Sequence, residues 1–445
     1  MKINTIKLQN YRGIRKLYLD LDKHLTVFFG ENGSGKSTVI DSIAIMLSWL
    51  VNRIRYSSST SGYPILEKNI TNGNAFASIS ISCCNYEKNI EWQLVKTRKL
   101  SSGSGLLSRK RLKDFRSSTN LDNLSEFTKS LHAKIFEAEE RLNLPIFVYY
   151  PVGRAVLDIP LRIREKHNFK IFAAYDHALE SGANFRTFFE WFREREDLEN
   201  ENRKYVDLPN KPDGFCFPDP QLEAVRNALK VFLPEFTDLT VRRSPLRMEI
   251  NKNGTKFIID QLSDGEKCLI AMIGDLARRM AISNPIRENP LDGEGVVLID
   301  EIDLHLHPKW QRIVVSRLVE VFPNCQFIIS THSPHVITHV HPENLYVLKQ
   351  TELGAIAERP SESYGKTVDR VLEDLMGLAT TRPDKVKSGL HEVYQRINLG
   401  QIAEAKELIA IMKGEVAGDP DLLIGSDPEL GRAEVIIRRK EIIGR

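Results

Sequence analysis

The sequence predicts an α/β fold in which a mixed sheet surrounds a phosphate-binding loop. An apolar run, Leu25–Phe29, leads directly into a glycine-rich loop and then into a helical pattern. Two further apolar runs, 295–299 and 325–329, each end in a cluster of polar residues. Short runs of this kind are typical of strands buried in a parallel sheet, and ligands bind beyond the carboxyl ends of such strands.

Composition narrows the class of protein. The chain has 445 residues, enough for several domains, and its net charge of +3 excludes a polybasic nucleic-acid binder as a whole. Five cysteines without zinc-ligand spacing argue against both a zinc site and a disulfide framework. The first residues contain no apolar leader region, and no uncharged apolar run reaches 18 residues. We therefore expect a soluble, cytoplasmic protein that does not enter a membrane.

The loop after the first strand, residues 30–37, fills the pattern G-x-x-x-x-G-K-[ST] at every fixed position. Its glycines allow backbone N–H groups to approach phosphate oxygens at the N-terminus of the following helix. Lys36 is predicted to reach the β- and γ-phosphates, and the Ser37 hydroxyl to ligate Mg²⁺. A chance glycine-rich turn is disfavoured because strand, loop, Lys-Ser pair and helix follow in order. The predicted ATP contacts are Gly30, Asn32, Gly33, Ser34, Gly35, Lys36, Ser37 and Thr38.

Other segments of the chain allow weaker predictions about structure and function. Residues 3–8 and 17–21 alternate between apolar and polar side chains, as strands do, and Arg12 lies in the loop between them. Residues 96–116 form a basic segment suited to a phosphate backbone, although a solvated loop without a partner has the same composition. Four phenylalanines at helical spacing in 185–192 favour a core stripe over a base-stacking platform. Sustained heptads are absent from 110–230, so we expect no long coiled coil.

A second set of motifs follows. Ser263, Gly265 and Glu266 precede a helical run and form a second candidate oxyanion site, although an ordinary helix N-cap has the same residues. The strand at 295–299 ends in Asp300 and Glu301. Asp300 is predicted to join the Mg²⁺ shell, and Glu301 to orient and deprotonate the attacking water.

The next apolar run leads to His332, which is predicted to sense the γ-phosphate through a hydrogen bond. A loop histidine with an ordinary partner is the alternative. His305 and His307 lie close together, but we expect local hydrogen bonding there rather than a metal site. The predicted catalytic residues are thus Glu301, Lys36 and His332.

The order of these motifs resembles the ABC-type ATPase heads of the SMC, RecF and OLD superfamily, chiefly over residues 1–50 and 235–350. The resemblance implies that Arg12 contacts a nucleotide or DNA phosphate and that Asp303 forms the D-loop. It also implies that Ser263 and Gly265 contact the γ-phosphate bound by another copy, in a homodimer or a multimer of dimers. The candidate for the Q-loop glutamine is Gln93.

The compact head, the helical insertion and the absence of an acidic nuclease pattern after His332 resemble the PtuA family of RecF-like ATPase subunits. That family belongs to Septu-type and retron-associated anti-phage systems. The resemblance implies a separate HNH nuclease partner under nucleotide control, with DNA, or a retron reverse transcriptase and its msDNA, as further candidate partners. A RecF-like DNA-repair ATPase that clamps duplex DNA through 96–116 is the alternative function. An ABC importer subunit is disfavoured by the LSDGE motif and the long insertion.

Four regions are expected on this basis. They are an N-terminal lobe with the phosphate-binding loop at 1–95, a basic loop and compact helical insertion at 96–235, a C-terminal lobe at 236–350, and a helical partner-docking region at 351–445. Helices in the last region either pack on the head or dock the partner.

Overall fold

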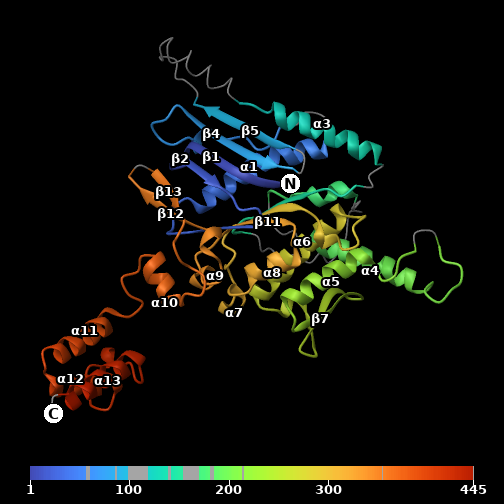
Figure 1. Ribbon diagram of the computed structural model, residues 1–445. Helices are drawn as coiled ribbons and strands as arrows, with labels where there is room; N and C mark the ends of the chain where they lie inside the picture. Colours follow the sequence, from blue (N-terminus) through green and yellow to red (C-terminus); the bar gives the residue numbers. More distant parts are fainter. Residues whose placement is uncertain are drawn as a thin grey trace, which may run out of the picture. The chain divides into compact units, whose positions relative to one another are not determined.

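The computed structural model describes residues 1–56, 61–85, 88–98, 119–138, 142–153, 170–180, 185–212, 215–352 and 354–443. These residues form two compact units, 1–366 and 367–445 (Figure 1). Most of the predicted basic segment at 96–116 lies outside the described residues, which resume at 119. The second unit begins later than the boundary expected at 351, because the chain after 351 first completes a strand of the first unit.

A six-stranded sheet organises the first unit, in the order β13-β12-β3-β11-β10-β6. Its strands are β3 (Leu25–Phe29), β6 (Ile146–Tyr150), β10 (Gly295–Ile299), β11 (Cys325–Ser330), β12 (Leu345–Thr351) and β13 (Gly354–Glu358). Neighbouring strands are parallel except for β12 and β13. Every residue of β3, β6, β10 and β11 is buried, which explains their largely apolar sequences. The predicted mixed sheet is confirmed.

Two antiparallel sheets complete the first unit. One, in the order β2-β1-β4-β5, consists of β1 (Lys2–Tyr11), β2 (Ile14–Asp20), β4 (Phe76–Cys84) and β5 (Asn89–Thr97). The other consists of β7 (Phe236–Arg243), β8 (Leu246–Lys252) and β9 (Thr255–Ile258). The buried Gln326 on β11 accepts from the Ile3 N–H at 2.7 Å and donates to the Ile3 carbonyl at 2.8 Å. These bonds tie β1 to the central sheet.

The helices of the first unit cover these sheets. They are α1 (Lys36–Arg55), α3 (Asp122–Glu137), α4 (Phe185–Arg203), α5 (Pro220–Phe232), α6 (Asp264–Ser283), α7 (Pro308–Gln311), α8 (Val314–Val321) and α9 (Pro334–Ile337). Short 3₁₀ turns span Glu67–Asn69, Ile171–Tyr175, Ile259–Gln261, Pro290–Asp292 and Pro342–Asn344. The blue strands lie beside α1 in Figure 1, and α1 contacts both β4 and the central strands β6, β10 and β11.

Two predictions about the helices are borne out. The four phenylalanines of α4 are buried, so the aromatic stripe belongs to the core. No helix among the described residues extends into a long coiled coil. By length and composition α1 passes the test for a membrane-crossing helix, but 67% of the relevant window is buried inside the fold.

The second unit is helical and has a core of its own. It contains α10 (Val368–Arg370), a π turn at Val371–Leu375, α11 (Asp384–Asn398), α12 (Ile402–Lys413), a 3₁₀ turn at Pro420–Leu422 and α13 (Pro428–Ile443). The apolar faces of α11, α12 and α13 pack against one another around Val393, Met412 and Ile437. Residues 368–375 form only the short α10 and the π turn, and the longer helices of this unit begin at Asp384.

Candidate functional site

The carboxyl ends of three adjacent strands meet at one edge of the central sheet. The glycine-rich loop follows β3, Thr331 and His332 follow β11, and Asp300 and Glu301 follow β10. Because β11 pairs in parallel with both β3 and β10, these residues emerge on the same side. Ligands bind at such edges in open α/β sheets. The structure therefore brings the main predicted site residues together.

The loop conformation depends on its glycines. Gly30 has a φ of 144°, and a Cβ at this position would stand 2.2 Å from the backbone oxygen of Leu348. Gly35, with a φ of 105°, is the N-cap of α1, and neither a side-chain cap nor an acidic residue occupies the first turn of this described helix. The backbone N–H groups at this helix end consequently have no side-chain acceptor, and an anion is favoured there.

Two side chains of the loop fit a phosphate ligand. The hydroxyl of Ser34 is buried and has no hydrogen-bond partner. The Lys36 ammonium donates to the carbonyl oxygens of Gly30 at 2.9 Å and Glu31 at 2.8 Å, so it lies across the loop. Burial lowers the pKa of Lys36, while the nearby carboxylates of Asp300, Glu301 and Asp303 oppose this effect. The cation of the loop and the acids after β10 therefore share one electrostatic environment.

The acidic pair after β10 is held by backbone and side-chain bonds. The Asp300 N–H donates to the Tyr150 carbonyl at 2.9 Å, which continues the β6–β10 ladder past the strand end. The Ser330 hydroxyl donates to Asp300 Oδ1, and the Glu301 N–H donates to Ser330 Oγ at 2.8 Å. Glu301 has a φ of 48°, a left-handed conformation that is uncommon for residues other than glycine.

The segment after β11 is connected to Asp303. The Thr331 hydroxyl and the His332 N–H both donate to Asp303 Oδ1, at 2.5 Å and 3.2 Å. Gln311 donates to the Asp303 carbonyl at 3.3 Å and accepts from the Ser333 hydroxyl at 2.7 Å. These bonds hold the chain around His332 against the chain around Asp303.

Burial and the nearby Lys36 cation lower the pKa of His332, although Asp303, Glu301 and Asp300 act in the opposite direction. The imidazole is therefore neutral at pH 7 in the ligand-free protein. A neutral imidazole has one donor and one acceptor nitrogen, so it can form a hydrogen bond with a phosphate oxygen.

Arg12 lies beside the second turn of the helix that follows the loop. Its N–H donates to the Asn69 carbonyl at 2.7 Å, and its guanidinium donates to Asp41 Oδ2 at 2.5 Å. The Tyr149 hydroxyl donates to the other carboxylate oxygen of Asp41 at 2.7 Å. Asp41 follows Ser37 by one helical turn, so the guanidinium of Arg12 is held at the second turn of α1.

The motif at 262–266 forms the start of α6. Ser263 is the N-cap, with its N–H donating to Glu266 Oε2 at 2.9 Å and its hydroxyl accepting from the Glu266 N–H at 3.4 Å. Glu266 Oε1 also accepts from the Lys252 ammonium at 2.5 Å, so both carboxylate oxygens are engaged within the chain. The Lys252 and Ser263 bonds outweigh burial and lower the pKa of Glu266. Gly265 lies against the His305 carbonyl.

Several predicted residues stand apart from this cluster. Gln93 lies on β5 in an antiparallel sheet and exchanges backbone hydrogen bonds with Asn120. Asn32 is exposed and Thr38 is partly buried. His307 caps α7 through a 3.2 Å bond from the Lys309 N–H. Among the described residues, no group of three or more His, Cys, Asp or Glu side chains is placed to hold a metal ion.

Sequence reasoning missed Ser330, Gln311 and the pair formed by Asp41 and Tyr149. Ser330 carried a usable signal, because it is a polar residue at the end of an apolar strand, as Asp300 is. Gln311, Asp41 and Tyr149 carried no such signal in the sequence, because their hydrogen-bond partners lie on distant elements or in a different loop.

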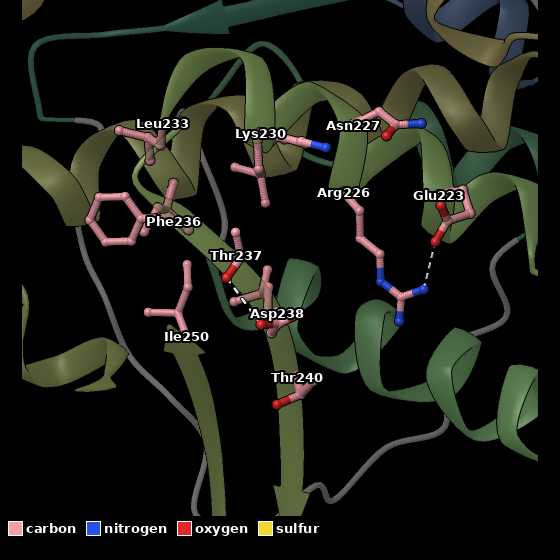
Figure 2. A pocket seen from close by; sticks show the side chains of 13 residues that line it. Glu223, Arg226, Asn227, Lys230, Leu233, Phe236, Thr237, Asp238, Thr240 and Ile250 are labelled. Atoms are coloured by element: carbon pink, nitrogen blue, oxygen red, sulfur yellow. Dashed lines mark hydrogen bonds and ion pairs between the residues drawn. The ribbon is translucent and has the colours of Figure 1, made fainter. Parts of the chain in front are cut away.

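A separate cavity of about 450 Å³ lies between α5 and the strands β7 and β8 (Figure 2). Its lining includes the apolar residues Leu233, Phe236 and Ile250 on one side and the charged residues Arg226 and Glu223 on the other. The Arg226 guanidinium is paired with Glu223 at 2.8 Å and with Glu199 at 3.0 Å. None of the residues that line this cavity belongs to the loop or to the acidic pair, so it is distinct from the candidate phosphate site.

Residues 25–338 match the family described as "AAA domain, putative AbiEii toxin, Type IV TA system". The chain is 29% identical to "Retron Ec83 probable ATPase" of Escherichia coli, over 95% of this chain and 85% of the relative. It is 31% identical to "Retron Vc95 probable ATPase" of Vibrio cholerae serotype O1 biovar El Tor, over 84% and 78%. "Septu protein PtuA" of Bacillus thuringiensis is 24% identical, over 85% of each chain.

These relatives confirm the resemblance to ATPase subunits of retron and Septu systems. Among solved structures, "SMC head domain from Thermotoga maritima" matches 81% of this chain and 100% of its own, with 16% identity and a TM-score of 0.40. The strand order of the central sheet, β13-β12-β3-β11-β10-β6, defines the fold of the first unit.

Proposed function

The chain belongs to the family of AAA domains that its residues 25–338 match, and on this basis we propose that it binds and hydrolyses Mg²⁺·ATP at the edge of the central sheet. One observation carries the proposal. Lys36, Glu301 and His332 follow the ends of β3, β10 and β11, where the Glu301 carboxylate acts on the Lys36 ammonium and both charges act on the His332 imidazole.

Each residue has a role that its chemistry supports. The N–H groups at the start of α1, the buried Ser34 hydroxyl and Lys36 would hold the phosphates. Ser37 and Asp300 would hold Mg²⁺, which supplies charge neutralisation of the phosphates when bound. Glu301 would accept the proton of the attacking water, and the neutral His332 would donate a hydrogen bond toward the γ-phosphate.

The second half of each ATP site would come from another copy of the chain. Within one copy, Ser263 and Gly265 stand at the N-terminus of α6, where Gly265 touches the loop that follows Glu301. A helix N-terminus is favourable for an anion, so the N–H groups there can receive the γ-phosphate bound by the other copy. Such a shared site would require a homodimer or a multimer of such dimers.

The ATPase would control a separate HNH-type nuclease in anti-phage defence. The named retron and Septu relatives support this setting. The second unit supplies a surface for the nuclease, because α13 buries one face in its own core and exposes Val435, Ile436 and Ile442 on the other. Arg432 and Arg439 are exposed on the same helix, so this surface suits an acidic protein segment with apolar side chains.

Co-expression with the flanking genes and purification through a tag on this chain tests the proposal. We expect a stoichiometric HNH protein whose DNA cleavage changes with ATP. The double variant V435D/I442D should lose that protein, whereas K387D, on an exposed position of α11, should retain it. A chain that purifies alone and binds duplex DNA only with ATP would instead identify a RecF-like repair ATPase.

A further inference from the structure

We propose that Ser330 is a positioning residue that holds both Asp300 and Glu301 in their working orientations. The inference rests on the proposed ATPase function, because it concerns the two acids assigned to Mg²⁺ and to the attacking water. It adds a residue that none of the predicted motif positions includes.

Ser330 is placed to reach both acids at once. It is the last residue of β11, the strand that lies between β3 and β10, and its side chain is completely buried. Ile299 on β10 pairs with Ile329, so Asp300 and Ser330 leave their strands at the same level. The Ser330 side chain is therefore directed toward the acidic pair, to which both of its hydroxyl hydrogen bonds are made.

One hydroxyl serves both neighbours. Its proton is donated to Asp300 Oδ1, and its oxygen accepts the Glu301 N–H at 2.8 Å. The donated bond fixes the rotation of the Asp300 carboxylate, whose oxygens are the kind of ligand that Mg²⁺ prefers. Alanine at position 330 would remove both interactions, while threonine would retain the hydroxyl.

The backbone of Ser330 acts on the same turn. The Ile302 N–H donates to the Ser330 carbonyl at 3.0 Å, so the residues on both sides of the Glu301 Cα are tied to Ser330. Glu301 adopts the left-handed conformation between these two bonds, with a φ of 48°. Such a conformation persists when the surrounding structure holds it in place, and here the two Ser330 bonds do so.

The role is one of positioning, because Ser330 acts through the acids. The Thr331 hydroxyl and the His332 N–H bond instead to Asp303, a different acid of the same loop. Loss of a hydrogen-bond partner of this kind commonly lowers metal affinity or activity by about 10–100-fold.

The test compares Ser330→Ala and Ser330→Thr with the wild type. Ser48→Ala is the matched control, because the Ser48 hydroxyl is also buried, donates to the Ile45 carbonyl at 2.6 Å and accepts from the Tyr63 N–H at 2.7 Å. The measurements are kcat and KM for ATP, the Mg²⁺ concentration for half-maximal binding of a fluorescent ATP analogue, and hydrogen–deuterium exchange of the segment that contains the Glu301 amide.

We expect S330A to lower kcat at least about tenfold, to leave KM for ATP within about threefold, and to raise the Mg²⁺ requirement. The Glu301 amide should exchange faster in S330A without nucleotide, and S330T should restore all of these properties. Wild-type turnover and wild-type exchange in S330A would overturn the inference. If the wild type itself hydrolyses no ATP, the proposed function fails, and the exchange measurement still decides the role of Ser330.

Discussion

Gly265 lies against the backbone carbonyl oxygen of His305 so closely that a Cβ built on Gly265 would stand 2.4 Å from that oxygen. Gly265 belongs to the first turn of α6, and His305 lies in the loop that follows Asp300 and Glu301. The start of α6 is thus in contact with the backbone of the loop that follows Asp300 and Glu301. This contact links the two halves of the proposed site within one molecule.

Gly265→Ala should separate these two segments. The added methyl group meets a backbone atom, which cannot rotate away, so we expect a loss of about 1–3 kcal/mol in the free energy of unfolding. ATP-dependent dimerisation should weaken as well, and analytical ultracentrifugation with and without Mg²⁺·ATP measures it. Gly431→Ala is the control, because a Cβ at Gly431 would meet nothing within 4 Å. Equal stability and equal dimerisation of G265A and G431A would show that the contact between Gly265 and His305 supports neither property.

Lys36→Ala should abolish ATP binding at micromolar concentrations. A charge-assisted hydrogen bond contributes about 1.5–3 kcal/mol, which corresponds to roughly 10–100-fold in affinity for each bond that is lost. Titration with a fluorescent ATP analogue measures the change. Lys349→Ala, which removes an exposed ammonium paired with Glu358 at 2.7 Å, should bind as the wild type does. Unchanged binding in K36A would exclude the assigned phosphate contact.

Glu301→Gln should retain ATP binding and lose turnover. Removal of a general base typically costs about 10²–10⁴-fold in rate, while the similar shape of glutamine leaves the site intact. Because hydrolysis is blocked, ATP should hold the dimer together, which size-exclusion chromatography can detect. Hydrolysis by E301Q at the wild-type rate would show that another group accepts the proton.

Mixing two inactive variants tests the site shared between copies. Lys36→Ala destroys the loop half of the site, and Ser263→Arg destroys the helix half, so each variant alone should be inactive. A dimer with one copy of each retains one intact site, and random exchange should restore up to about one quarter of the wild-type activity. Absence of any recovery after confirmed subunit exchange would argue against a site built from two copies.

The stability of the ligand-free protein should depend on pH through His332. Burial and Lys36 lower the pKa of His332 in the folded state, so protonation favours the unfolded state, in which the pKa is about 6.5. The contribution of His332 is therefore fully present above about pH 6.5 and is lost as the pH falls through its lower folded-state pKa.

Thermal unfolding between about pH 5 and pH 7.5 measures this dependence. His332→Gln should show a smaller decrease in unfolding temperature at acidic pH than the wild type. His391→Gln, on an exposed position of α11, should follow the wild type. An identical decrease in H332Q and the wild type would contradict the assignment.

The sequence alone determined the local parts of the site. The loop at 30–37 and the pair Asp300–Glu301 were recognisable because their chemistry needs particular residues at fixed short spacings, next to strands whose burial makes them apolar. His332 was found in the same way, from its place after a buried strand. The membership of the family was also accessible, because the order of the motifs along the chain is a property of the sequence.

Only the tertiary structure decided which of these segments touch. Pairings between strands that are distant in the sequence place β11 between β3 and β10. Ser330 can form hydrogen bonds with both Asp300 and Glu301 because of this strand order. In the second unit, the sequence led us to expect helices that pack on the head or dock a partner, whereas α11, α12 and α13 bury their apolar faces against one another. A hydrophobic pattern specifies that one face of an element is buried. Because the hydrophobic effect is non-directional, the packing of the whole chain decides which other element covers that face.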